Sequence, residues 1–182
     1  MDKASIRKTM KAKRRSLNHK EQKNASACII ALLHRDEIYL SADVVAMYHP
    51  LDDEIDLLAL LDDDKTFCFP RIKKTESAEM DFVAWTDKGF QNGPFNLKEP
   101  VGASFEKTNI DLFLVPGLAF TTHGARIGYG KGYYDHYLHD VGALKYGICH
   151  SFQIIPGGWA DEDDVPMDKL LTPERMIVCI PQ

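Results

Sequence analysis

Residues 112–115 form a wholly apolar run, Leu-Phe-Leu-Val, that ends at Pro116-Gly117. An uninterrupted apolar run of this length lacks the alternation of a half-exposed strand, and it is typical of a central strand buried on both faces of a sheet. Such strands belong to parallel sheets whose two faces are covered by helices. This run therefore favours an α/β protein.

The rest of the chain alternates between strand-like and helix-like patterns. Short β-branched and apolar runs predict strands at 44–48, 66–69, 80–85, 146–149 and 177–180, and helical spacing predicts helices at 2–15, 18–33, 54–61 and 132–139. The stretch 86–104 is rich in Gly and Pro and predicts a long loop or pair of turns. We predict a three-layer α/β/α fold with a largely parallel, Rossmann-like sheet.

The 182 residues suffice for one domain, so we predict a single domain over 1–182. The formal charge of −5 gives no global attraction to nucleic acid or to an anionic membrane. The first 24 residues, however, hold nine basic and two acidic residues, whereas the remainder holds 13 and 25, so a basic helical arm precedes an acidic body. Four widely spaced cysteines and the lack of a signal peptide or apolar span predict the cytoplasm.

The segment RIGYGKGYYD, residues 126–135, carries the strongest functional signal. Glycines let backbone N–H groups turn towards an anion, and Arg126 and Lys131 add positive charge, so the segment predicts a phosphate cradle. It matches neither the P-loop nor the dinucleotide pattern GxGxxG. The alternative is a flexible turn before a helix.

Asp135 closes this segment and is a candidate metal ligand. A carboxylate beside phosphates is repelled unless a cation lies between them, and Mg²⁺ commonly uses one or two carboxylates together with phosphate oxygens. A second carboxylate could come from the acidic residues near the C-terminus, Asp161, Glu162, Asp163, Asp164 and Asp168. The alternatives are a helix-capping role for Asp135 and a solvated acidic run.

Other candidates lie in the arm and after the first two predicted strands. Lys3 and Arg7 are four residues apart, so they share a helix face that could cover a phosphate group. A merely solvated face and a nucleic-acid arm are the alternatives. His49 and Glu54 follow the first strand and Arg71 follows the second, where ligands bind in α/β sheets. Surface exposure of His49 and a helix-terminal role for Glu54 are the simpler interpretations.

RIGYGKGYYD, preceded by VPGLAF and Gly124, closely resembles the signature of the 5-formyltetrahydrofolate cyclo-ligase (methenyltetrahydrofolate synthetase) family. Residues 3–7 and the segments MYHPLDDEID, FCFPRI and VPMDKLLT occur in the family's order. The resemblance implies an ATP- and magnesium-dependent ligase that converts 5-formyltetrahydrofolate to 5,10-methenyltetrahydrofolate and releases ADP and phosphate. In that mechanism the formyl oxygen is phosphorylated, nitrogen 10 attacks, and phosphate leaves.

The resemblance also implies roles for individual residues. Contacts with ATP would come from Lys3, Arg7, Arg126, Ile127, Gly128, Tyr129, Gly130, Lys131, Gly132, Tyr133 and Tyr134. Contacts with the folate would come from His49, Glu54, Tyr129, Gly130, Lys131, Gly132 and Tyr133. Lys131 and Arg126 would be catalytic, and Asp135 and Asp168 would hold Mg²⁺. Thr121 stands where the family often has Asp and receives no role, and Arg71 would contact a phosphate or the folate.

Two other functions stay open at this point. A sugar-phosphate isomerase-like enzyme would use a phosphate cradle without ATP, and a nucleic-acid-binding protein would use the basic arm. We favour the ligase, acting on small molecules as a monomer without nucleic-acid or membrane partners.

Overall fold

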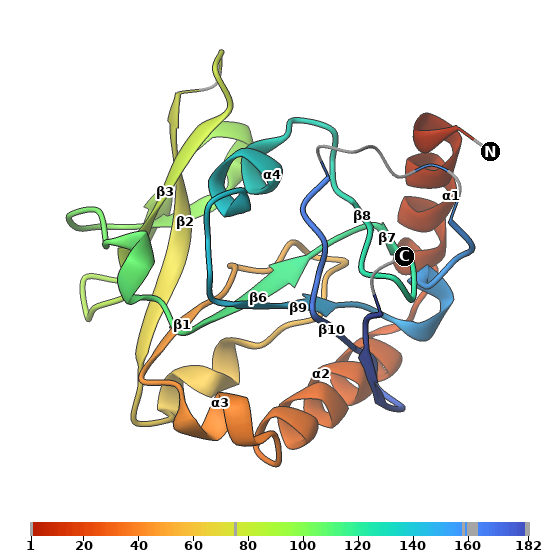
Figure 1. The fold of residues 1–182 in the computed structure, drawn as a ribbon, viewed down its shortest axis with the longest axis horizontal. Helices are drawn as coiled ribbons and strands as arrows, with labels where there is room; N and C mark the ends of the chain where they lie inside the picture. Colours follow the sequence, from red (N-terminus) through yellow and green to blue (C-terminus); the bar gives the residue numbers. More distant parts are fainter. Residues whose placement is uncertain (1, 75, 158, 160–163, 181–182) are drawn as a thin grey trace.

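A computed structural model describes residues 2–74, 76–157, 159 and 164–180 (Figure 1). A seven-stranded sheet runs through the molecule in the order β11-β10-β9-β6-β1-β2-β3. In that order the strands are Met176–Val178, Lys169–Leu171, Leu144–Ile148, Leu112–Pro116, Val44–Ala46, Thr66–Lys74 and Glu79–Ala84. The five inner strands are parallel, and the edge strands β11 and β3 are antiparallel to their neighbours.

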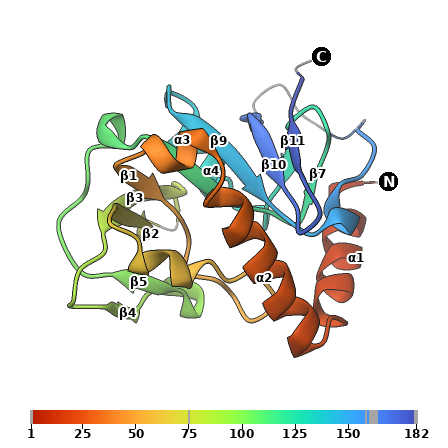
Figure 2. The same ribbon diagram turned by 90° about the horizontal axis from the view of Figure 1, so that it is seen from below.

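Helices cover both faces of this sheet, which confirms the predicted three-layer α/β/α architecture (Figures 1 and 2). One face packs against α2 (His19–Leu33), α3 (Glu37–Ser41) and the 3₁₀ turn η1 (Leu58–Asp62). The other face packs against α4 (Tyr133–Leu138). Two further 3₁₀ turns, η3 (Lys107–Asn109) and η4 (Ser151–Gln153), lie in connections.

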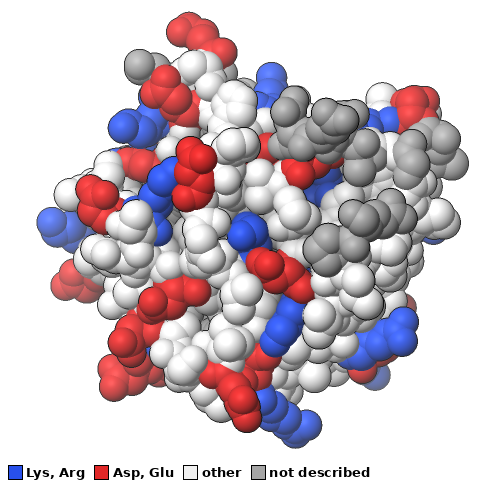
Figure 3. Space-filling view, viewed as in Figure 1, with Lys and Arg blue, Asp and Glu red and all other residues white. Residues whose placement is uncertain are grey.

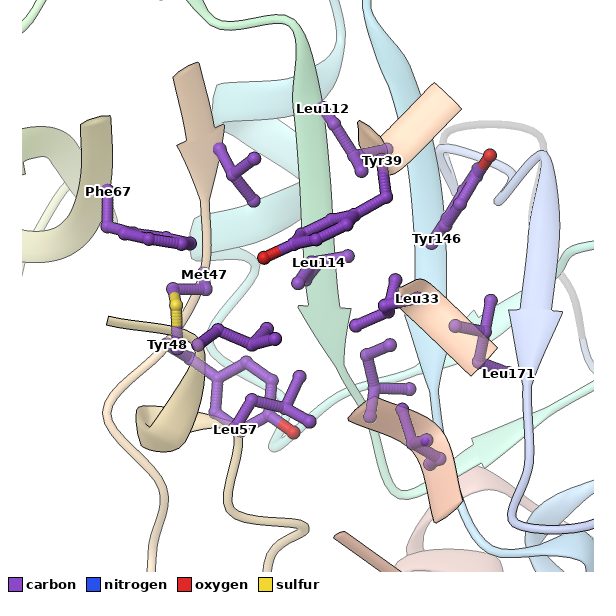
Figure 4. Close-up of a cluster of buried hydrophobic side chains, with 14 of the residues drawn as sticks. Leu33, Tyr39, Met47, Tyr48, Leu57, Phe67, Leu112, Leu114, Tyr146 and Leu171 are labelled. Carbon is purple, nitrogen blue, oxygen red and sulfur yellow. The ribbon is translucent and has the colours of Figure 1, made fainter. Parts of the chain in front are cut away.

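Strand β6 lies in the middle of the sheet, and its position explains the apolar run at residues 112–115. Leu112 and Leu114 point into the core beneath α2 and α3, where Tyr39 and Tyr146 also pack (Figure 4). Phe113 and Val115 point into the core on the opposite face. Because alternate side chains of a strand point to opposite faces, burial of all four confirms a central strand.

A third cluster joins the N-terminal helix to a small hairpin. Helix α1 (Lys3–Arg15) places Ile6 and Met10 against Leu118, Ala119 and Ile127. Two of these lie in strands β7 (Ala119–Phe120) and β8 (Arg126–Ile127), which pair in an antiparallel hairpin after β6. The hairpin leads into the glycine-rich segment, so α1 packs directly beside it.

The region after β1 differs from the predicted helix at 54–61, because only η1 is helical. The Asp56 carboxylate accepts the Leu58 N–H, and the Glu54 carboxylate accepts the Leu51 N–H. Side chains that bond neighbouring backbone groups compete with a regular helix. The buried side chains Ile55 and Leu57 therefore reach the core from a loop.

Strand β2 also differs from its prediction, since it continues through Pro70 to Lys74. β1 pairs with β2 only as far as Cys68, and beyond it the pairing is with β3. Pro70 lies past the end of β1, where its missing N–H interrupts no contact with that strand. The expected loop at 86–104 holds β4 (Phe90–Asn92), the 3₁₀ turn η2 (Pro94–Asn96) and β5 (Lys98–Pro100), which form a hairpin.

None of the helices in the described part of the chain has both the length and the apolar character needed to cross a bilayer. On the face seen in Figure 1, basic and acidic side chains are interspersed (Figure 3).

Candidate functional site

A cavity of about 560 Å³ opens at the carboxyl ends of β1, β2 and β6. The whole glycine-rich segment 126–135 forms one wall, and further lining comes from His49 after β1, Pro70 within β2 and Pro116 at the end of β6. The β4–β5 hairpin forms the opposite wall. Ligands in parallel α/β sheets bind at this edge, as the sequence predicted for the glycine-rich segment.

Helix α1 supplies two cations to the wall formed by the glycine-rich segment. Arg7 Nε donates to the carbonyl oxygen of Gly128 at 2.9 Å, and its guanidinium lies against Gly130. Gly130 has a φ of 94°, a conformation that favours glycine. Lys3 Nζ lies 2.9 Å from the carboxylate of Asp164, which also lines the cavity. Lys3 and Arg7 therefore line the same cavity as the glycine-rich segment, and Arg7 contacts the segment directly.

Arg126 and Asp135 form an ion pair across the base of the same segment. Arg126 Nη2 donates to Asp135 Oδ1 at 2.9 Å, and the guanidinium carbon lies 5.3 Å from the centre of the Tyr134 ring. Arg126 is 5% exposed, and its Nε has no hydrogen-bond partner among the described residues. A buried donor without a partner is costly, so the ion pair with Asp135 leaves the guanidinium only partly satisfied.

Lys131 lies at the tip of the segment and faces the opposite wall. Its Nζ is 5.8 Å from the centre of the Phe95 ring. Phe95 is 58% exposed although it is a large apolar residue, and it lines the cavity. The exposed ring and the ammonium group therefore flank the cavity, within reach of a ligand that carries both a charged and an aromatic part.

The far end of the cavity contains a hydrogen-bonded network around Glu54. Its Oε1 accepts the Tyr129 hydroxyl at 2.8 Å and lies 3.5 Å from Arg14 Nη1. Arg14 Nη2 donates to the Tyr129 oxygen at 2.5 Å and to Asp53 Oδ1 at 2.8 Å. Arg14 is 2% exposed. A buried arginine therefore fixes two residues, Glu54 and Tyr129, that line the cavity.

The charges of this network shift the pKa values of its members. Burial raises the pKa of the Tyr129 hydroxyl, and the Glu54 carboxylate raises it further, although Arg14 opposes the change. Burial would lower the pKa of Arg14, but Tyr129, Glu54 and Asp53 outweigh it and the net change is upward. Tyr129 therefore stays a neutral donor and Arg14 stays a cation.

An apolar region adjoins this network. His49 packs edge-on against Phe90 with ring centres 4.8 Å apart, and its Nδ1 lies 3.3 Å from the Pro50 carbonyl oxygen. The remaining apolar lining comes from β2, β3 and the β4–β5 hairpin, namely Pro70, Ile72, Met80 and Leu97. The cavity is thus cationic at one end and apolar at the other.

Asp168 is the main predicted residue that the structure does not bring to the cavity. It lies at the beginning of β10, and its carboxylate accepts the Lys145 N–H at the beginning of β9. Because β9 and β10 are parallel, both beginnings lie at the amino edge of the sheet, opposite the cavity. Asp164, one of the other acidic candidates, lines the cavity instead. Asp161, Glu162 and Asp163 lie outside the described residues.

Arg71 and Thr121 are also engaged elsewhere. Arg71 forms a two-bond ion pair with Asp81 on β3 and donates to the Gly102 carbonyl oxygen. Thr121 is buried, and its hydroxyl accepts the N–H groups of His123 and Ala125 in the turn between β7 and β8. Neither residue lines the cavity.

The sequence reasoning passed over Arg14, Phe95 and Glu99. A signal for Arg14 was present, because Lys3, Arg7 and Arg14 share one helix face. Phe95 and Glu99 lie in the expected loop, where no periodic pattern indicated that two strands would turn them towards the site.

A family model described as the 5-formyltetrahydrofolate cyclo-ligase family matches residues 1–173. The chain belongs to the 5-formyltetrahydrofolate cyclo-ligase family. A 5-formyltetrahydrofolate cyclo-ligase from Mycoplasma pneumoniae is 30% identical over 96% of this chain and 100% of its own. One from Mus musculus is 25% identical over 93% and 92%. The resemblance stated from RIGYGKGYYD is therefore confirmed.

Solved structures agree with this membership of the cyclo-ligase family. The 5,10-methenyltetrahydrofolate synthetase of Aquifex aeolicus has a TM-score of 0.88 and 30% identity, covering 100% of this chain and 95% of its own. The synthetase of Mycoplasma pneumoniae has a TM-score of 0.76 and 27% identity, over 96% and 100%.

The cavity's carboxylates fit the magnesium ion that an ATP-dependent cyclo-ligase implies. Asp135 and Asp164 line the same cavity, and each is paired with a cation, Arg126 and Lys3 respectively. Mg²⁺ commonly takes one or two carboxylates and completes its shell with phosphate oxygens and water. Two carboxylates in a cavity that is also lined by cationic side chains have this chemistry.

Proposed function

We propose that this protein cyclises 5-formyltetrahydrofolate to 5,10-methenyltetrahydrofolate, with conversion of ATP to ADP and phosphate. The observation that carries the proposal is the two-ended cavity. A cationic glycine-rich wall faces an apolar, aromatic region, and one cavity therefore suits a phosphate chain and a folate ring together. The family membership supports the same activity.

The cationic end binds the nucleotide. Arg7 holds the glycine-rich segment through the Gly128 carbonyl oxygen, and its remaining guanidinium donors serve the phosphates. Lys3 exchanges its contact with Asp164 for a phosphate oxygen. Asp135 and Asp164 would hold Mg²⁺, which supplies positive charge at the phosphate oxygens when it is bound.

The apolar end orients the folate. Its ring lies between the β4–β5 hairpin and the glycine-rich segment, with the exposed Phe95 ring and the Tyr133 end of the segment available for packing. His49 contributes packing, since its ring is already held against Phe90. Glu54 is fixed by Tyr129 and Arg14, and its carboxylate lies at the folate.

In the reaction the formyl oxygen attacks the γ-phosphorus of ATP and ADP leaves. Nitrogen 10 then attacks the activated formyl carbon and closes the ring. Nitrogen 10 loses its proton, and phosphate departs from the former formyl carbon. Phosphorylation is needed because an amide oxygen is otherwise a poor leaving group. Lys131 and Arg126, which both line the cavity, stabilise the charge that develops on the transferring group.

We also propose that residues 1–182 act as one catalytic domain and as a monomer in the cytoplasm. The cavity is complete within one chain, and the four cysteines carry free thiols. Size-exclusion chromatography with light scattering tests the monomer, which a dimeric mass at working concentration would contradict.

The test of the activity mixes the protein with 5-formyltetrahydrofolate, ATP and Mg²⁺ and follows the absorbance of the methenyl product. An increase that needs both ATP and Mg²⁺ is expected. Lys131→Ala and Asp135→Asn should each lower kcat/KM by about 100-fold or more, as the loss of a charge-stabilising group does. Lys8→Ala, an exposed cation on the same helix as Lys3, is the control and should keep wild-type turnover.

No product from the wild type would overturn the proposal. Isomerisation of a sugar phosphate without ATP would support the other enzyme class, and tight, salt-sensitive binding of nucleic acid would support a binding protein.

A further inference from the structure

Glu99 is a buried carboxylate in the wall of the cavity that no step of the proposed mechanism uses. It lies in the middle of β5 and is 4% exposed. Its Oε1 accepts the Ile72 N–H at 2.8 Å. Ile72 lies on β2 beyond the last residue that pairs with β1, so Glu99 satisfies a backbone donor that the shorter neighbouring strand leaves open.

The Glu99 carboxylate lacks a cationic partner among the described side chains. No described Lys, Arg or His forms an ion pair with it, and its Oε2 accepts no hydrogen bond from a described residue. Three apolar residues, Ile72, Met80 and Leu97, line the same cavity. Because Oε2 is neither fully buried nor bonded to a described residue, it stays open to a donor from a ligand in the cavity.

Gly93 holds this side chain in position. A Cβ at Gly93 would collide with the carboxyl group of Glu99, so the side chain lies directly against the glycine backbone. The Gly93 N–H donates to the Leu97 carbonyl oxygen at 2.8 Å and closes the turn of the hairpin. Between Gly93 and the Ile72 N–H, the carboxylate is fixed before any ligand arrives.

Glu54, another carboxylate that lines the cavity, is differently placed. Its Oε1 accepts from Tyr129 and lies near Arg14, and its Oε2 accepts the Leu51 N–H. Both of its oxygens are therefore engaged within the protein. Glu99 alone of the two keeps an oxygen without a described partner.

We propose that Glu99 determines specificity by accepting two parallel N–H bonds from the pyrimidine edge of the substrate's pteridine ring, the 2-amino group and the adjacent N3–H. This inference rests on the proposed function. Two neighbouring N–H donors match the two oxygens of a carboxylate, as the fork of an arginine does. An apolar surround strengthens such bonds, and it penalises ligands that lack the donors because the carboxylate is then left unpaired.

The test compares two ligands on wild-type and Glu99→Gln protein by isothermal titration calorimetry. The ligands are 5-formyltetrahydrofolate and its analogue in which a methyl group replaces the 2-amino group. Wild-type protein should bind the analogue about 10- to 100-fold more weakly, the range for a charge-assisted hydrogen bond. Glu99→Gln keeps the size of the side chain and an oxygen for the Ile72 N–H, and it should lose most of this discrimination by binding the parent more weakly. Its affinity for ATP should stay at the wild-type value.

Two further variants make the result decisive. Glu76→Gln, the same substitution at an exposed position in the turn between β2 and β3, should behave as wild type. Glu54→Gln separates the two carboxylates and should keep the discrimination between the ligands even though it weakens folate binding. If Glu99→Gln does not fold, Glu99→Asp, which keeps the charge but shortens the side chain, carries the same comparison.

If the Glu99 variants still discriminated between the two ligands, or if Glu54→Gln lost the discrimination instead, this inference would be overturned. The proposed function would still stand as long as the wild type formed the methenyl product. Failure of the wild type to bind or cyclise the folate would overturn the proposed function itself, which the absorbance assay reports separately.

Discussion

Replacing Arg14 by Met tests whether the network at the apolar end of the cavity depends on one buried cation. The substitution keeps an unbranched side chain but leaves Asp53 and Glu54 without their shared partner. The exposed fraction of the side chain is only 3% for Arg14, 15% for Asp53 and 6% for Glu54. Breaking a buried ion pair costs about 3 to 5 kcal/mol, and the partial solvation of Asp53 places this case near 3 kcal/mol. For a domain of this size that lowers Tm by about 6 to 12 °C.

Urea denaturation and thermal melting followed by circular dichroism measure this loss. Arg15→Met is the matched control, because Arg15 is the next residue on α1 and is exposed, so its loss should stay within about 0.5 kcal/mol. A double-mutant cycle with Tyr129→Phe should show a coupling of about 1 kcal/mol, since Arg14 and Tyr129 share a hydrogen bond. Equal destabilisation by Arg14→Met and Arg15→Met, with no coupling, would refute the reasoning.

Three other predictions concern the glycine-rich segment, the cavity and pH. Gly130→Ala should weaken ATP binding more than Gly132→Ala does, as measured by calorimetry. Both residues have a positive φ, but only at Gly130 would an added Cβ lie against the Arg7 guanidinium, at 3.3 Å. Equal losses of affinity in the two variants would contradict this prediction. Lys131→Met should raise KM for the folate as well as lower kcat, since its Nζ lies near the Phe95 ring, and an unchanged KM in steady-state assays would argue against that contact. Burial lowers the pKa of His150 below 6.5, and the positive charge of Arg14 lowers it further. The unfolded chain therefore binds a proton at this residue more readily than the folded protein does. The free energy of unfolding consequently falls as the pH drops through 6.5 towards the folded-state pKa. His150→Gln should flatten Tm between pH 7 and pH 5, and an unaltered slope would contradict the assignment.

Most of the sheet was predictable because four of its five inner strands, β9, β6, β1 and β2, leave a strong local pattern. β6 is buried on both faces, so its composition alone indicated a central position. β7, β8 and β10 have two or three residues each and were not predicted. Segments so short carry no periodicity, and their pairing is decided by tertiary contacts.

The site was predictable where glycine and charge coincide in a short segment. Residues 126–135 all line the cavity. Asp168 shows the limit of this reasoning, because spacing did not reveal that it begins a strand at the opposite edge. Arg14 shows a second limit. Arg14 and Arg15 are the same residue type at neighbouring positions, and they differ only in that Arg14 lies on the side of α1 that packs against the β7–β8 hairpin.

The contacts of α1 with the cavity have a consequence for the order in which the site is built during synthesis. Arg7 bonds Gly128, 121 positions later in the chain, and Lys3 pairs with Asp164, 161 positions later. Helix α1 is therefore synthesised well before its partners in the cavity exist. Loops of this length close slowly. The cationic end of the cavity is therefore incomplete until residue 164 has been synthesised, and a shorter chain lacks part of the proposed ATP site.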